Sequence, residues 1–229
     1  MRGLASVAFA AALGLAGCTA PGPGLMSPGR PQDQAEIAAH RFVIVVKTVE
    51  PVAERECRRQ SPRLNCDFLI AVDDRPGQPV NAFQSEDDTG RPVLIFTLAL
   101  IGDVRNEDEL AFIMSHEAAH HIRNHLALQN VNASIGARVL GDLATAAGAS
   151  VNDVELASRV GASIGARRYS QQYELEADEL GARIAEAAGF DAVAGALYFT
   201  RIPDPGDSFL GTHPPNAARM EIVRRAVGR

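Results

Sequence analysis

The stretch His116–His125, HEAAHHIRNH, contains four of the six histidines of this 229-residue chain and one glutamate. Residues four apart lie on nearly the same face of an α-helix. If the stretch is helical, His116 pairs with His120, and His121 pairs with His125. The sequence therefore offers two candidate pairs of metal ligands.

The residues between the histidines distinguish the two pairs. Glu117 completes HExxH, in which two imidazoles bind Zn²⁺ and the glutamate acts on the metal-bound water. The second pair encloses Ile-Arg-Asn, which supplies no base and places a cation beside a divalent metal. We predict that His116 and His120 bind metal and that Glu117 is catalytic. His121 and His125 are left as packing, hydrogen-bonding or outer-site residues.

A catalytic zinc also needs a third protein ligand and an open position for water. The segment Tyr173–Gly181, YELEADELG, offers carboxylates. Glu174 and Asp178 lie one turn apart and share a helix face, whereas Glu176 points elsewhere. These acidic residues could also form a solvated helix face.

HExxH followed by ExxxD resembles the M48 family of zinc metallopeptidases, which includes membrane-bound quality-control proteases and soluble periplasmic or lipoprotein members. The resemblance implies one Zn²⁺ per chain, with Glu174 as the third ligand and Asp178 supporting the site. Glu176 is the main competitor of Glu174. Asp178 would accept a hydrogen bond from a ligand histidine and fix its tautomer.

The resemblance covers roughly residues 36–219. Asn81, Ala82 and Phe83 look like the family's NAF stretch on the strand beside the cleft, and THPP at 212–215 with Arg219 looks like its late HP...R element. By resemblance, His213 is a candidate fourth ligand or gate, against the alternative of a surface histidine. The segment 97–102, TLALIG, departs from the family pattern and leaves the cleft edge undefined.

The family implies an endopeptidase that acts on protein or peptide substrates. Zinc lowers the pKa of its water and polarises the scissile carbonyl, and Glu117 passes the water proton to the leaving amine. The sequence does not assign the residue that stabilises the oxyanion. The candidates are Tyr169, Tyr173, His125 and Arg219. The expected substrates are misfolded or stalled envelope proteins. The alternative is a chaperone-like outer-membrane assembly factor with a structural or autoinhibited zinc site.

The first residues predict export. Residues 1–17 have one basic residue and then an apolar run that is too short to span a bilayer comfortably, as in a secretory signal peptide. LAGC, ending at Cys18, looks like the lipobox of bacterial lipoproteins, whose cysteine is lipidated. Thr19 follows instead of aspartate, which implies an outer-membrane anchor facing the periplasm. Residues 18–35 are rich in Pro and Gly and predict a flexible tether, followed by the peptidase domain at 36–229.

An oxidising compartment favours a disulfide between Cys57 and Cys66, the two cysteines other than Cys18. Their spacing is not CxxC and no histidine lies near, which disfavours metal binding by this pair. The net charge of -6 and pI near 5.5 lack the basic surface of nucleic-acid binders, so no nucleic-acid partner is expected.

The rest of the sequence predicts an α+β domain, mainly helical and zincin-like, with a small antiparallel β-sheet from strands near 77–83 and 91–97 and a further short strand at 67–72. Helices are expected at 107–129, with Asn106 as a capping residue, at 170–188, from Asp191, and from Asn216. The region 131–168 is rich in Ala, Gly and Ser and contains ASIGAR twice. We interpret the two copies as chance or as similar helix packing, because solenoids need about three repeats.

Overall fold

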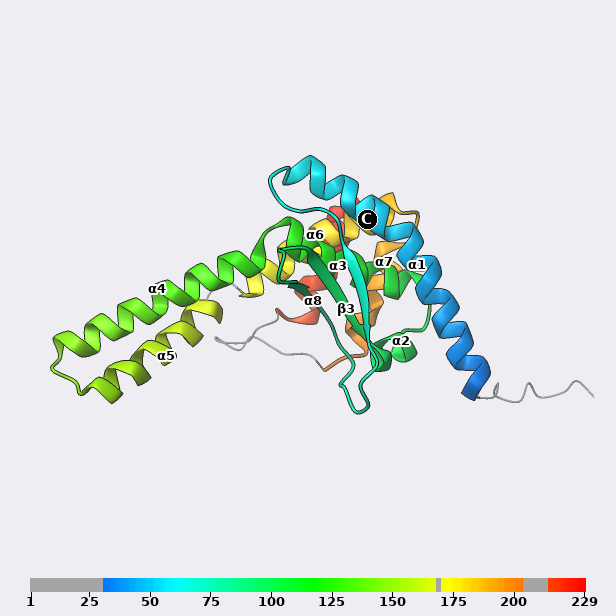
Figure 1. Ribbon diagram of the computed structural model, residues 1–229. Coiled ribbons are helices and arrows are strands. Elements are labelled where there is room, and N and C mark those ends of the chain that lie inside the picture. The colour runs from blue at the N-terminus through cyan, green and yellow to red at the C-terminus, as the bar shows by residue number, and fades with distance from the viewer. Residues whose placement is uncertain (1–30, 168–169, 204–213) are drawn as a thin grey trace, which may run out of the picture.

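Helix α3, Glu107–Ile122, lies at the centre of the fold in the computed structural model, which describes residues 31–167, 170–203 and 214–229. The side chain of Asn106 caps it by accepting a hydrogen bond from the backbone N–H of Glu109, as the sequence predicts. The neighbours of α3 are α1, the sheet, α6 (Ser170–Ala187) and α7 (Ala192–Ala196) (Figure 1). Most side chains of α3 are therefore buried, including both histidines at 116 and 121.

Helix α1, Pro31–Gln60, covers one side of α3. Its buried face repeats every four residues, as expected for an amphipathic helix. This face consists of Val45, Val49, Ala53 and Cys57. Because α1 begins at Pro31, residues 31–35 of the expected tether are helical. Cys18 and the expected signal peptide lie outside the described residues.

Three short strands form one sheet with the order β1-β3-β2. Strands β2 (Ala82–Glu86) and β3 (Pro92–Thr97) pair antiparallel, which confirms that part of the predicted sheet. Strand β1 (Leu69–Asp73) pairs with β3 in parallel, so the whole sheet is mixed. The reason is the connection between β1 and β2, which carries the chain past β3 to the far edge. Strand β2 is consequently an edge strand.

The predicted single helix at 107–129 is wrong, because the chain breaks between α3 and α4 (His125–Ala146). Asn124 adopts the left-handed conformation with φ of 59°, which asparagine tolerates better than most residues. The new helix starts at the next residue. His121 and His125 are therefore on different helices, and the expectation that they share one helix face is also wrong.

Helices α4 and α5 (Val151–Arg167) form a long hairpin that extends away from the rest of the molecule (Figure 1). A Cβ atom on Gly136 would lie 2.1 Å from the carbonyl oxygen of Gly161, and one on Gly165 would lie 2.1 Å from that of Asn132. Gly136 and Gly165 are the glycines of the two ASIGAR copies, so the hexamers serve close helix packing. Among the described residues, no helix is long and apolar enough to cross a bilayer.

The remaining elements close the core around the cleft. Helix α2 (Leu98–Asp103) occupies the segment that departs from the family pattern, and Thr97 caps it. Helix α6 ends close to the predicted position, and Asp191 caps α7, which continues into a 3₁₀-helix, η1 (Leu197–Thr200). Helix α8 (Asn216–Ala226) starts where the sequence predicts and packs against α6 and α7.

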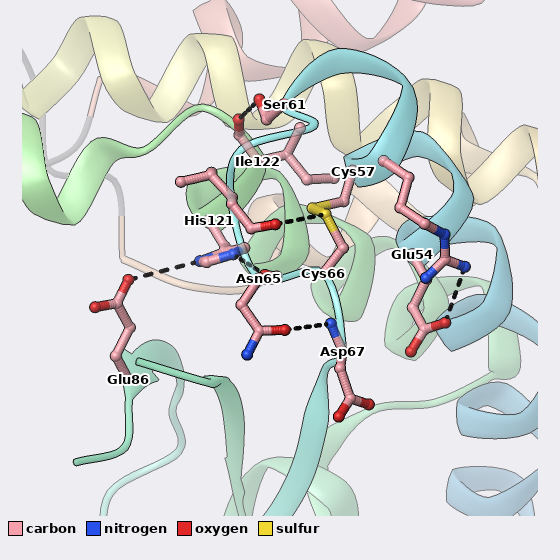
Figure 2. The surroundings of a disulfide bond; sticks show 11 residues. Glu54, Cys57, Ser61, Asn65, Cys66, Asp67, Glu86, His121 and Ile122 are labelled. Atoms are coloured by element: carbon pink, nitrogen blue, oxygen red, sulfur yellow. Dashed lines mark hydrogen bonds and ion pairs between the residues drawn. A yellow bond between two sulfur atoms is a disulfide. The ribbon is translucent and has the colours of Figure 1, made fainter. Parts of the chain in front are cut away.

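Cys57 near the end of α1 and Cys66 ahead of β1 are joined by a disulfide, and both residues are buried. Figure 2 shows the short loop that the disulfide closes, with His121 of α3 beside it. The His121 Nε2–H donates to the carbonyl oxygen of Asn65 at 2.7 Å, and Ser61 donates to the carbonyl of Ile122 at 2.7 Å. The disulfide loop is thus attached to the helix that carries HExxH.

We expect the Cys57→Ala/Cys66→Ala double variant to unfold at lower urea concentration, with a loss of roughly 2 to 3 kcal/mol from the unconstrained denatured chain. Urea titrations followed by circular dichroism measure this, and reduced wild-type protein should match the variant. Equal midpoints for the oxidised protein and the variant would show that the bond contributes nothing.

Candidate metal centre

Helix α6 approaches α3 closely enough to place its carboxylates beside the HExxH histidines. The contact is at Gly181, where an added Cβ would lie 2.9 Å from both N and Cα of His116. Asp178 and Glu174 lie on the same side of α6, about one and two turns before this glycine. The glycine in YELEADELG therefore allows two carboxylates to reach one metal-binding helix.

Three donor atoms converge between the helices. The His116 Nε2 and His120 Nε2 atoms are 3.0 Å apart, and the two oxygens of Glu174 lie 3.5 Å from His116 Nε2 and 3.3 Å from His120 Nε2. Ligand atoms about 2.1 Å from a tetrahedral zinc are about 3.4 Å from one another. Two imidazoles and one carboxylate are also a donor set of catalytic zinc sites. The residues present fit a zinc ion in both chemistry and spacing.

Asp178 holds the ring of His116. The Nδ1–H of His116 donates to Asp178 at 2.9 Å, so Nε2, 3.5 Å from Glu174, is the nitrogen that can bind a metal. Arg219 of α8 donates to both oxygens of Asp178 at 2.7 Å and lies over the ring of Phe199, 3.6 Å from its centroid. The support of His116 therefore includes α8 as well as α6.

The charges around His116 and Asp178 favour the protonated imidazole and the ionised carboxylate. Burial alone would raise the pKa of Asp178, but the adjacent Arg219 and His116 outweigh it and lower that pKa. Burial alone would lower the pKa of His116, but its hydrogen bonds to Asp178 and Glu174 raise the pKa to about 10. A metal that binds here must displace the proton of His116, so metal affinity falls with acidification.

Glu117 lies between two hollows of the surface. One, of about 430 Å³, is mostly apolar and is bounded by side chains of α2, α3 and η1, including Leu100, Phe112 and Phe199. The other, of about 290 Å³, is more polar and includes Gln84. Both hollows also contact His116 and Glu174. A molecule that fills both hollows would therefore lie against the metal position and the Glu117 carboxylate together.

The NAF stretch lies beside both hollows. Asn81 and Ala82 line the apolar and the polar hollow, and Phe83 lines the polar one. The Asn81 N–H donates to the Thr97 hydroxyl at 3.1 Å, and the Asn81 carbonyl accepts a hydrogen bond from the Thr97 N–H at 3.0 Å, which fixes the Asn81 backbone. His213, the candidate fourth ligand or gate, lies outside the described residues, as does Tyr169.

The other two histidines of the opening stretch have separate roles. His121 points to the disulfide loop (Figure 2) and is not one of the three donor residues. Burial lowers the pKa of His121, which keeps it neutral. His125 instead contacts the outer nitrogen of His120, with 3.0 Å between the two Nδ1 atoms, and Glu176 contacts His125 at 3.3 Å. Glu176 is therefore not placed among the three donors.

The sequence predicts neither of two contacts that support this site, although it named both residues, His125 and Arg219. It counted His125 as half of a pair with His121, because it did not anticipate the helix break at Asn124. It named Arg219 through the late HP...R element, but gave no sign of the contact with Asp178. The residue types could have indicated this contact, because a buried carboxylate such as that of Asp178 usually needs a cation such as Arg219.

Comparison with known proteins shows the family of this chain. A model of peptidase family M48 matches residues 44–227. The chain belongs to peptidase family M48. It is an M48 metallopeptidase, and this family implies zinc at the site built from His116, His120 and Glu174.

Two curated relatives are similar over part of the chain. The putative beta-barrel assembly-enhancing protease of Vibrio cholerae is 35% identical over 110 residues, which are 44% of this chain and 22% of the relative. The beta-barrel assembly-enhancing protease of Escherichia coli strain K12 is 28% identical over 132 residues, which are 52% of this chain and 27% of the relative. The chain thus matches about a quarter of the length of these proteins.

The close contact at Gly181 makes a prediction for the M48 site. Gly181→Ala places a methyl group against the backbone of His116, which cannot rotate away, so α6 must shift and carry Glu174 with it. We expect a loss of about 1–3 kcal/mol of stability and weaker zinc binding. Gly102→Ala is the control, because nothing lies within 4 Å of its added Cβ. Equal melting temperatures and zinc affinities for both variants would contradict this account.

Proposed function

We propose that this M48 metallopeptidase is a zinc-dependent endopeptidase of the bacterial cell envelope. In this proposal His116, His120 and Glu174 hold one Zn²⁺, Glu117 is the general base, and Asp178 orients His116. The observation that carries the proposal is the set of donor separations, 3.0, 3.3 and 3.5 Å, beside a carboxylate that borders both hollows.

The residues divide the chemistry between them. Zinc, when bound, lowers the pKa of a coordinated water and polarises the scissile carbonyl. Glu117 accepts the proton of the attacking water and donates it to the leaving amine. Asp178 and Arg219 keep the His116 lone pair directed at the metal position. The disulfide occupies both described cysteines, so neither is a nucleophile.

The substrate class follows from the walls of the cleft. Strand β2 is the edge of the sheet, and residues 81–84 line the polar hollow, so an extended peptide can add to this edge as a further strand. The apolar hollow of about 430 Å³ can accept a large apolar side chain next to the scissile bond. Such sequences are exposed in misfolded or stalled proteins, the proposed substrates.

The proposed location rests on the N-terminal sequence and on the relatives. Lipidation at Cys18 would anchor the protein to the outer membrane, facing the periplasm. The relatives are named for enhancing beta-barrel assembly. Cys18→Ala should move the protein from the membrane fraction to the soluble periplasmic fraction, and an unchanged distribution would reject the anchor.

The alternative is an outer-membrane assembly factor with an autoinhibited or structural zinc site, and the words assembly-enhancing in the relatives' names agree with its assembly role. His213 would block the metal as a fourth ligand or gate. Support comes from its neighbour Pro214, which is buried, and from Arg219 on the following helix, which reaches the site. His213→Ala should then raise the rate of peptide cleavage. An unchanged rate would reject the proposal that His213 blocks the metal.

A peptide library tests the substrate proposal. Purified, zinc-loaded protein should cleave unfolded polypeptides such as casein beside large apolar residues. Val80 is exposed at the apolar hollow, so Val80→Glu should lower kcat/KM for apolar substrates by about 10-fold or more. Val72→Glu is the matched control, because Val72 is similarly exposed and lines neither hollow. Equal effects of the two variants would reject the apolar hollow as a subsite.

A further inference from the structure

The second HExxH histidine has a partner of an unusual kind. His116 is held directly by a carboxylate, whereas the outer nitrogen of His120 faces another imidazole, that of His125, at 3.0 Å between the Nδ1 atoms. His125 is buried, with 1% of its surface exposed. Its other nitrogen, Nε2, lies 3.3 Å from Glu176 at the rim. Three side chains therefore form a line from the metal position to solvent, in the order His120, His125, Glu176.

Hydrogen-bond chemistry fixes the direction of this line. Two ring nitrogens 3.0 Å apart need one proton between them, so one donates and the other accepts. His120 can bind metal through Nε2 only if its Nδ1 carries the proton, which makes His125 Nδ1 the acceptor. The proton of neutral His125 is then on Nε2, directed at the carboxylate of Glu176. Each side chain thus determines the tautomer of the next.

The surroundings of His125 hold its ring in place. Its ring stacks on that of Tyr173, with 4.6 Å between the centroids and 19° between the planes. The Tyr173 hydroxyl accepts a hydrogen bond from Asn132 of α4 at 3.0 Å. The left-handed Asn124 ends α3 and starts α4 at His125, which turns this imidazole back toward His120. A continuous helix would have placed it one turn beyond His121 instead.

We propose that His125 and Glu176 are positioning residues that hold His120 in the tautomer and orientation needed to bind zinc. Glu176 does for His120, through His125, what Asp178 does directly for His116. Each imidazole of the metal site thereby has its own carboxylate. This inference rests on the proposed function, because it assumes that His120 binds metal through Nε2.

Zinc affinity of the metal-free full chain is the first test, measured by competition with a chromophoric chelator. Loss of such an outer partner typically weakens metal binding about 10- to 100-fold, so this loss is expected for His125→Ala. His125→Gln keeps an acceptor for the His120 N–H and should recover part of the affinity. His121→Ala is the matched control, because His121 is also buried in the same stretch but contacts the disulfide loop and is not a donor residue.

A second variant avoids the risk of unfolding. Glu176 is partly exposed, so Glu176→Gln should leave the fold intact and weaken zinc binding in the same direction by a smaller factor. Glu179→Gln, on the same helix and paired with Arg183, should leave the affinity unchanged. Nitrogen-15 spectra of histidine-labelled, zinc-loaded protein should show His120 with a proton on Nδ1.

The outcomes separate this inference from the proposed function. If wild-type protein fails to bind one zinc per chain, the proposed function fails. If it binds one zinc and His125→Ala and Glu176→Gln weaken binding no more than their controls, only the positioning role fails. A His120 tautomer with its proton on Nε2 would also overturn it.

Discussion

Glu117→Gln is expected to lower kcat/KM for peptide hydrolysis by roughly 10²- to 10⁴-fold, while the protein keeps its zinc and its melting temperature. The amide has the shape of the carboxylate but cannot accept the proton of the attacking water. The measurement is cleavage of a fluorogenic peptide, together with the metal content of the same sample. Glu107→Gln, an exposed change in the first turn of the same helix, is the control.

The result also separates the two proposed functions. If Glu117→Gln leaves both peptide cleavage and the cellular phenotype untouched, the endopeptidase proposal fails. Loss of cleavage with a retained phenotype would support the assembly-factor alternative.

Glu174→Gln is expected to weaken zinc binding by at least about 100-fold, because it replaces a charged ligand with a neutral amide. His116 and His120 alone would then hold the metal. Glu179→Gln on the same helix, where Glu179 is partly exposed and paired with Arg183, should bind zinc like the wild type. Chelator competition and metal analysis decide the prediction. Zinc bound at unit stoichiometry with unchanged affinity in Glu174→Gln would remove this residue from the ligand set.

Sequence patterns predicted the central part of the site because each pattern is local. HExxH lies within one helix, and Glu174 and Asp178 lie one turn apart in another, so helical periodicity alone places each pair. The family resemblance supplied the relation between the two helices. In the structure, that relation depends on Gly181, whose missing side chain allows the close contact.

The parts that were not predicted depend on single backbone conformations and on distant contacts. A left-handed Asn124 divides the expected helix, and asparagine only tolerates this conformation without requiring it. The parallel pairing of β1 with β3 depends on the path of the connection between β1 and β2, which local alternation of apolar residues does not encode. The partnership of Arg219 with Asp178 joins residues 41 apart in sequence.

Anomalous diffraction at the zinc absorption edge, from crystals of the zinc-loaded protein, tests the central claim most directly. The account predicts one peak about 2.0–2.2 Å from His116 Nε2, His120 Nε2 and a carboxylate oxygen of Glu174. The same map would identify His213 or water in the fourth position. A peak ligated by His121 or Glu176, or no peak between α3 and α6, would contradict the account.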